Sequence, residues 1–251
     1  MDELGLIIDF HRSAERQGPG SDAATQRAIA LSGLASSPSL TIADIGCGTG
    51  ASALVLAQDL QAQIKAVDLH RPFLDDLQTR AAKTGVAEQI EVVEASMDAL
   101  PFDPGSLDAI WSEGAIYSMG FAAGVSAWRQ FLKPGGVLAV SELTWLTKDR
   151  PAELTDHWRT AYPEVAGAAE KIAVLESEGF SPLGYFPLDT GCWLENYYRP
   201  MQARFDAFQN RHGHAAEAVA LVEAEKQEID LYERHVDFVS YGFYVARLAN
   251  V

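Results

Sequence analysis

The chain has 251 residues and a formal net charge of −16, from 19 basic and 35 acidic side chains, with the apolar content of an ordinary globular protein. Nucleic-acid binding depends mainly on Lys and Arg, and an acidic surface repels DNA, RNA and anionic membranes, so we expect neither nucleic acid nor a membrane as a partner. No stretch approaches the roughly 18 apolar residues of a membrane span. The two cysteines are too few for a disulfide scaffold or a zinc cluster, so we expect a cytoplasmic protein without a metal site.

The first part of the chain alternates between strand and helix patterns. Pro72 suits the first turn of a helix that Gly85 ends, and residues 40–45 read as a buried strand. Strands separated by helical segments form βαβ units, so these patterns predict a parallel sheet. After a helix at 22–34, the sequence predicts strands at 40–45, 62–69, 89–95, 106–112 and 137–143, with helices at 51–60, 72–85 and 124–136.

Beyond residue 145 the alternation stops. Two short helices are expected at 150–163 and 168–180, and the strand expected at 180–188 is confined to a sheet edge by its two prolines. Residues 195–234 form a polar, helix-prone stretch, in which the acidic residues of 215–234 are interpreted as a solvated face. Residues 237–249 are rich in aromatic and β-branched residues and predict a final strand. We expect one domain over 1–251, with a core of about 36–145 plus the C-terminal strands and helical additions at about 1–35, 146–178 and 190–235.

Three glycines follow the first predicted strand, in "ADIGCGTG". Glycine permits positive φ and leaves no side chain between the backbone and a ligand, so Gly46, Gly48 and Gly50 suggest a nucleotide-like molecule. A P-loop is excluded because no Gly-Lys-Ser/Thr follows. A dinucleotide turn and a turn without a ligand stay open at this point. Asp68, at the end of the second strand, suits the ribose of a nucleotide-like ligand.

Five segments together resemble a known family. "ADIGCGTG", "AVDL", "ASMDALPF", "LDAIWSEGAIY" and "LKPGGVLAVSE" are similar, in order and spacing, to the class I S-adenosylmethionine-dependent methyltransferases. The most similar group is the small-molecule methyltransferases of the ubiquinone/menaquinone biosynthesis type, and the resemblance covers roughly 40–145. It implies an α/β, Rossmann-like fold: a seven-stranded, mostly parallel sheet with a C-terminal antiparallel strand, helices on both faces and a helical lid.

The resemblance implies S-adenosylmethionine as the cofactor and assigns its site residue by residue. An anion at Asp44 suits the cationic ammonium and sulfonium, and would repel a pyrophosphate. Ser96 stands where the family usually has an acid, so the adenine contact is left open between Ser96, Met97 and Asp98. Arg16 and Gly20 suit the methionyl carboxylate, with a surface loop as the alternative. The predicted cofactor residues are Arg16, Gly20, Asp44, Gly46, Cys47, Gly48, Asp68, Leu69, Ser96, Met97, Asp98 and Ser112.

The methyl acceptor is expected beyond the fourth and fifth strands, where Glu113, Tyr117 and Glu142 are the predicted catalytic residues. Glu113 is interpreted as a base, as a ligand of an amine acceptor or of the cofactor's ammonium, or as a hydrogen-bonding strand cap. The aromatic and acidic residues of "GCWLENYYRP" suggest a lid that binds a cation by π interactions, with core packing between the added helices and the sheet as the alternative. The hypothesis is methyl transfer to a small molecule, such as an amine or other cationic metabolite. The alternatives are an S-adenosylmethionine-binding protein without methyl transfer and an NAD(P)-dependent oxidoreductase. A homodimer stays open.

Overall fold

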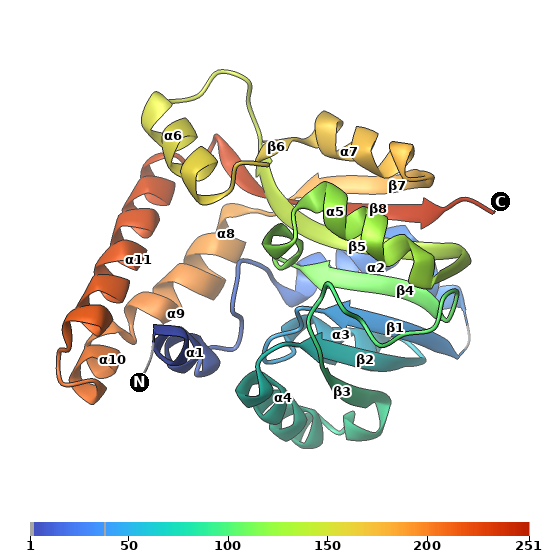
Figure 1. Ribbon diagram of the computed structural model, residues 1–251, viewed down its shortest axis with the longest axis horizontal. Coiled ribbons are helices and arrows are strands. Elements are labelled where there is room, and N and C mark those ends of the chain that lie inside the picture. The colour runs from blue at the N-terminus through green and yellow to red at the C-terminus, as the bar shows by residue number, and fades with distance from the viewer. Residues whose placement is uncertain (1–2, 38, 251) are drawn as a thin grey trace.

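A mostly parallel β-sheet runs through the molecule (Figure 1). The computed structural model describes residues 3–37 and 39–250. Seven strands lie in the order β3-β2-β1-β4-β5-β8-β7, and the two-residue β6 pairs with β5 off this path. The strands are β1 (Leu40–Ile45), β2 (Ala62–Asp68), β3 (Ile90–Glu94), β4 (Leu107–Glu113), β5 (Leu132–Trp145), β6 (Ala166–Gly167), β7 (Phe180–Pro187) and β8 (Val239–Leu248).

The strand directions confirm the predicted fold class. β1 to β5 pair in parallel, whereas β8 is antiparallel to both β5 and β7. β7, which contains Pro182 and Pro187, forms the edge of the sheet and pairs only with β8 among the described strands. This position agrees with the sequence, because proline cannot donate to a central ladder.

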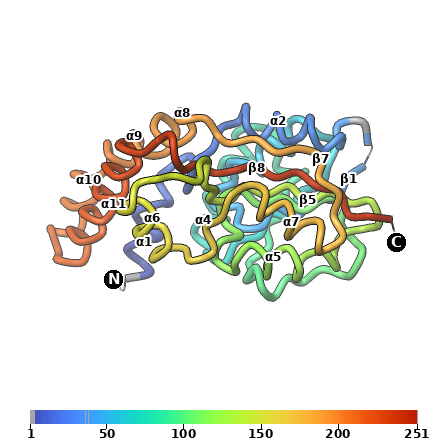
Figure 2. The backbone as a smooth tube through the Cα atoms, turned by 90° about the horizontal axis from the view of Figure 1, so that it is seen from above, coloured from blue at the N-terminus to red at the C-terminus, as the bar shows by residue number. Residues whose placement is uncertain are grey.

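Helices cover both faces of the sheet (Figure 2). Residues of α2 (Asp22–Ser32), α3 (Ala51–Asp59) and α4 (Arg71–Thr84) share one buried apolar cluster, and residues of α5 (Phe121–Trp128) and α7 (Ala168–Ser177) belong to a second. Local sequence signals determine where these helices begin and end. The Ser21 hydroxyl caps α2 by accepting from the backbone N–H of Ala24 at 3.1 Å, and Gly85 ends α4 at φ +76°.

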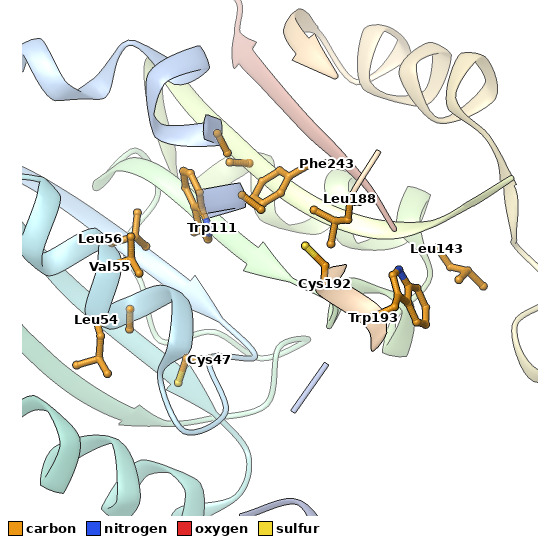
Figure 3. Packing of buried hydrophobic residues seen from close by; sticks show 14 of the residues in the cluster. Cys47, Leu54, Val55, Leu56, Trp111, Leu143, Leu188, Cys192, Trp193 and Phe243 are labelled. Atoms are coloured by element: carbon orange, nitrogen blue, oxygen red, sulfur yellow. The ribbon is translucent and has the colours of Figure 1, made fainter. Parts of the chain in front are cut away.

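Large aromatic rings on the central strands belong to the first core cluster. Trp111 on β4 and Phe243 on β8 lie with ring centroids 5.6 Å apart, and both side chains are buried (Figure 3). Because these strands are next to β5 on either side, the aromatic contact fixes the middle of the sheet on which the site is built.

Further helices gather at the carboxyl ends of the parallel strands, at the left of Figure 1. Among the described residues, none of the helices combines the length and apolar character needed to cross a membrane. The helices at these strand ends are called the lid below. They are α1 (Glu3–Arg12), α6 (Ala152–Ala161), α8 (Thr190–Trp193), the π-helical η5 (Leu194–Tyr198), α9 (Arg199–Gln202), α10 (Phe205–Arg211) and α11 (Ala216–Arg234). Short 3₁₀ segments complete the chain: η1 (Leu34–Ser36), η2 (Ala87–Gln89), η3 (Ile116–Ser118) and η4 (Arg129–Phe131).

Two sequence-based boundaries were wrong. The helix expected at 124–136 ends at Trp128, and β5 begins at Leu132, so the Pro-Gly-Gly segment lies in the strand rather than after the helix. Pro134 cannot continue a helix and Gly135 has φ +77°, so the chain turns earlier than the apolar pattern indicated. The stretch 195–234 is divided into several helices, with the π-helical segment at its start.

Candidate active site

The glycine loop after β1 has the backbone that the sequence predicted. Gly46, Gly48 and Gly50 have φ values of +72°, +54° and +87°, which side chains disfavour. A Cβ atom on Gly46 would collide with Ala115, and one on Gly50 would collide with Leu77. Both glycines are therefore required by conformation and by packing, and they bring the backbone of the loop close to its neighbours.

Asp68, at the end of β2, is hydrogen-bonded to this loop. Its Oδ2 accepts from the N–H of Gly48 at 2.9 Å, and its Oδ1 accepts from the N–H of His70 at 2.9 Å. Burial raises the pKa of Asp68. The next side chain, Leu69, is 58% exposed beside this carboxylate. A carboxylate oxygen holds more than one lone pair, so Asp68 retains capacity for hydroxyl donors while it orders the loop.

Asp44 lies beneath the loop with its side chain buried. Its Oδ2 accepts from the Ser52 hydroxyl at 2.7 Å, whereas its Oδ1 is buried and has no hydrogen-bond partner within residues 3–37 and 39–250. Burial raises the pKa of Asp44 to about 7, and repulsion by Glu113 and Asp68 acts in the same direction. An orphaned buried carboxylate oxygen is costly, and it fits a cationic ligand group above the loop.

The residues after β3 lie on the other side of the loop. Met97 is half-buried, and its Cε lies 3.7 Å from the position that a Cβ atom on Gly46 would take. The Met97 carbonyl accepts from Trp128 Nε1 at 2.9 Å, which fixes this turn. Ser96 is half-buried and Asp98 is exposed. Cys47, within the loop, is buried, and burial raises the pKa of its thiol.

Glu113 is held in a network rather than free in the pocket. Its Oε1 accepts from the Thr25 hydroxyl at 2.7 Å and from Trp111 Nε1 at 2.9 Å, and its Oε2 lies 3.5 Å from Arg16 Nη1. Arg16 also donates to Asp22 at 2.7 Å. This is the geometry of the strand-cap alternative, with both carboxylate oxygens occupied.

A segment from the N-terminal region crosses the glycine loop as a strap, defined here as residues 13–20. Gln17 Oε1 accepts from the N–H of Thr49 at 2.9 Å, and Gln17 Nε2 donates to the Ala14 carbonyl at 3.1 Å. A Cβ atom on Gly48 would collide with Gln17. The Gly20 carbonyl accepts from Asn196 Nδ2 at 2.8 Å, so the strap is joined to the lid at its other end.

The remaining predicted residues lie in different surroundings. Ser112 is buried, and its hydroxyl donates to the Ile45 carbonyl at 2.8 Å, so it links β4 to β1. Tyr117 is 49% exposed on η3. Glu142 is buried, and its Oε1 accepts from the N–H of Leu143 at 2.7 Å. Burial raises the pKa of Glu142 to about 7, and the Lys171 ammonium opposes this effect.

A cavity of about 420 Å³ lies between the strap, the strand ends and the lid. Gly114 and Leu143 line it, so it reaches the carboxyl ends of β4 and β5, but Glu113 and Glu142 themselves are not among its lining residues. Two acids on α11, Glu225 and Glu228, line its far side. Seven of the lining residues have large aromatic rings: Phe73, Tyr117, Trp158, Tyr162, Trp193, Tyr197 and Tyr241.

The sequence interpretation missed the two acids of α11, because it treated this helix as a solvated face. The sequence did contain one signal that these acids face the protein interior. Val222, Ile229 and Tyr232 are buried on α11, and Glu225 falls on the same stripe at helical spacing. An acid in an apolar stripe indicates a polar site under the helix. Within residues 3–37 and 39–250, no cluster of three or more His, Cys, Asp or Glu side chains could hold a metal ion.

Comparisons with known proteins agree with this fold and loop. Residues 42–136 match a family model described as a methyltransferase domain. The chain is 32% identical over 124 residues to a ubiquinone/menaquinone biosynthesis C-methyltransferase of Brucella anthropi, covering 48% of this chain and 47% of the relative. It is 28% identical over 147 residues to a 2-methyl-6-phytyl-1,4-hydroquinone methyltransferase of Synechocystis sp., covering 54% of this chain and 45% of the relative. The chain thus spans about half the length of these curated relatives.

A solved structure extends the likeness of fold to nearly the whole chain. An S-adenosylmethionine-dependent methyltransferase from Geobacter sulfurreducens, in complex with S-adenosyl-L-homocysteine, superposes with a TM-score of 0.83 at 16% identity and covers 96% of each chain. The sheet order, the glycine loop and the strand-end carboxylate define the class I methyltransferase architecture. Residues 42–136 therefore match a methyltransferase domain, and the chain has the Rossmann-like fold of the class I S-adenosylmethionine-dependent methyltransferases.

Proposed function

We propose that the protein transfers a methyl group from S-adenosylmethionine to a small molecule, and that this acceptor is an amine or another cationic metabolite. The observation that carries the proposal is the continuity of two sites at the strand ends. The strap residue Gln17 touches the glycine loop and also lines the aromatic cavity. A donor on the loop and an acceptor in the cavity would therefore meet beneath the strap.

The residues around the loop fit the cofactor. The positive-φ backbone of Gly46 and Gly48 shapes the loop, the orphaned Oδ1 of Asp44 suits an ammonium, and Asp68 suits the ribose hydroxyls. Ser96, Met97 and Asp98 remain the candidates for adenine. When bound, S-adenosylmethionine supplies a methyl carbon on a positively charged sulfur, which a nucleophile displaces in line.

The protein's contribution is positioning and exclusion of water. Fixing two reactants in a productive geometry can supply about 7–11 kcal/mol of the barrier. Tyr117 is the predicted catalytic residue that lines the cavity, and we propose that it contacts the acceptor. We propose that Glu113 acts through Arg16 as a positioning residue that holds the strap. Glu142 precedes Leu143 on β5 and does not line the cavity, so we propose no contact between Glu142 and the acceptor.

The acidic composition supports a small molecule rather than a nucleic acid as the acceptor. The aromatic cavity supports a cation, because ring faces attract positive charge. The cytoplasmic location and the homodimer considered from the sequence stay predictions.

Isothermal titration with S-adenosylhomocysteine, followed by a turnover assay with a panel of amines, alcohols and thiols, tests the proposal. We expect binding, and methyl transfer to at least one amine. Asp68→Asn should weaken binding by about 10-fold or more, because a charged hydrogen-bond acceptor is lost. The matched control Asp103→Asn changes an exposed acid and should bind as the wild type does. Binding without turnover on any acceptor would favour a non-catalytic protein, and binding of NAD(H) alone would favour an oxidoreductase.

A further inference from the structure

Two carboxylates of the lid face the aromatic cavity from one side of α11. Glu225 and Glu228 are one helical turn apart, and both line the cavity. Glu225 stands on the buried stripe of Val222, Ile229 and Tyr232, where an apolar side chain would complete the packing. A carboxylate at this position packs less well than an apolar side chain would, but it places an acidic group next to the cavity.

The protein supplies one neutral donor and no paired cation to these carboxylates. The Tyr198 hydroxyl donates to Glu228 Oε1 at 2.9 Å. Within residues 3–37 and 39–250, no Lys, Arg or His forms an ion pair with either acid, although Lys226 on the same helix pairs with Glu223 at 2.7 Å. Burial raises the pKa of Glu225 to about 7, with repulsion by Glu228 adding to it. Burial also raises the pKa of Glu228, and the nearby His157 opposes this effect without forming an ion pair. Two half-buried acids without an ion-pair partner are costly, and a cationic ligand would remove that cost.

The other residues that line the cavity restrict the chemical class of the ligand. Aromatic faces such as those of Trp158 and Tyr197 attract any cation, including a quaternary ammonium. Carboxylates are acceptors only and form their strongest hydrogen bonds with charged N–H donors. A site that has both features is matched by an ammonium that carries at least one N–H. A quaternary ammonium leaves the carboxylates without donors, and an alcohol leaves them without a positive charge.

We propose that Glu225 and Glu228 form the cation-binding subsite of the acceptor pocket and that they bind a protonated primary, secondary or tertiary amine of the methyl acceptor. This inference rests on the proposed function, because it assigns the aromatic cavity to the acceptor. Glu113 and Glu142, the acids predicted at the strand ends, do not line the cavity, whereas Glu225 and Glu228 do.

The test uses the full chain saturated with S-adenosylhomocysteine and three matched probes: 2-phenylethylamine, its N,N,N-trimethyl analogue and 2-phenylethanol. Calorimetry should show that the amine binds most tightly. Glu225→Gln and Glu228→Gln should each weaken amine binding by about 10-fold or more, since each removes a hydrogen bond between charged groups. The control Glu217→Gln changes an exposed acid of the same helix and should leave amine binding unchanged.

The outcomes separate the two proposals. If S-adenosylhomocysteine itself does not bind, the proposed function fails. If it binds but the amine shows no advantage over both analogues, or if Glu225→Gln and Glu228→Gln bind the amine as the wild type does, the cation subsite is overturned while methyl transfer stands. Thermal unfolding of both variants shows whether they are folded. We expect no loss of stability in Glu225→Gln, because the substitution removes an unpaired half-buried charge.

Discussion

Arg16 Nη1 lies 3.5 Å from Glu113 Oε2, between residues 97 positions apart in the chain. The two side chains are 10% and 8% exposed, so this ion pair is largely shielded from water. Glu113 ends β4 and Arg16 belongs to the strap over the glycine loop. The pair therefore ties the covering segment to the sheet at the point where the donor and acceptor sites meet.

Glu113→Gln should loosen this attachment. Gln can still accept from Thr25 and Trp111, but it loses the negative charge that faces Arg16. We expect a loss of about 2 kcal/mol in the free energy of unfolding, typical of a shielded hydrogen bond between charged groups. We also expect weaker binding of S-adenosylhomocysteine, because the strap is less well held. Urea denaturation and calorimetry measure the two effects.

The matched control for Glu113→Gln is Glu178→Gln, which removes a more exposed ion pair. Glu178 pairs with Arg129 at 3.2 Å, with side chains 26% and 45% exposed. Exposed pairs contribute about 0–1 kcal/mol, so this variant should differ little from the wild type. Equal losses in the two variants would show that the Glu113 pair has no special structural role.

Gly46→Ala should damage both folding and cofactor binding. At φ +72° a side chain costs about 1–2 kcal/mol, and the added Cβ atom collides with Ala115. Gly85→Ala isolates the first cost, because Gly85 has φ +76° and a Cβ atom there meets no neighbour within 4 Å. We expect Gly85→Ala to lower stability by about 1 kcal/mol and to keep its affinity for S-adenosylhomocysteine. Gly46→Ala should lose more stability and most of its affinity, and equal behaviour of the two alanines would remove the collision argument.

Gln17→Ala should speed the release of the cofactor. Gln17 links the strap to the N–H of Thr49, and its side chain covers Gly48. Removal of this hydrogen bond, worth about 1 kcal/mol, should raise the dissociation rate of S-adenosylhomocysteine by about 5- to 10-fold. Tryptophan fluorescence during displacement can follow the release. Gln26→Ala is the control, since Gln26 bonds the exposed Asp59 on α3, and a similar acceleration there would argue against a strap.

The local parts of the site could be predicted from the sequence. The glycine loop, the bounds of β1 and the end of α4 at Gly85 depend on residues that are neighbours in the chain, where φ preferences and helix stops act directly. The class of fold followed from the alternation of strands and helices. The edge position of β7 followed from its prolines.

The acceptor side could not be predicted in the same way, because its residues meet only through tertiary packing. The environment of Glu113 is set by Arg16 and Thr25, which lie 97 and 88 positions away. The acids of α11 reach the cavity because the helix folds over the strand ends. The sequence position of an acid at the end of a strand does not show which distant side chains hold it, whereas an acid within an apolar helical stripe marks a position next to the cavity.

Asp44 should make stability depend on pH. Its folded pKa is about 7, against about 3.9 for an unfolded aspartate, so the folded state retains a proton that the unfolded state releases. Below about pH 4 both states hold this proton and above about pH 7 neither does. Between these values the free energy of unfolding should fall as the pH rises, by at most about 4 kcal/mol. Asp44→Asn has no such proton, so its stability relative to the wild type should rise from pH 4 to pH 8.

Urea denaturation of both proteins at pH 4 and pH 8 measures this difference, with Asp103→Asn as an exposed control. The same substitution removes the negative charge under the glycine loop, so Asp44→Asn should bind S-adenosylhomocysteine more weakly even where it is the more stable protein. Parallel pH profiles for Asp44→Asn and the wild type would show that Asp44 does not carry the raised pKa. A gain in stability together with a loss of affinity would show that this buried carboxylate is retained for the ligand rather than for the fold.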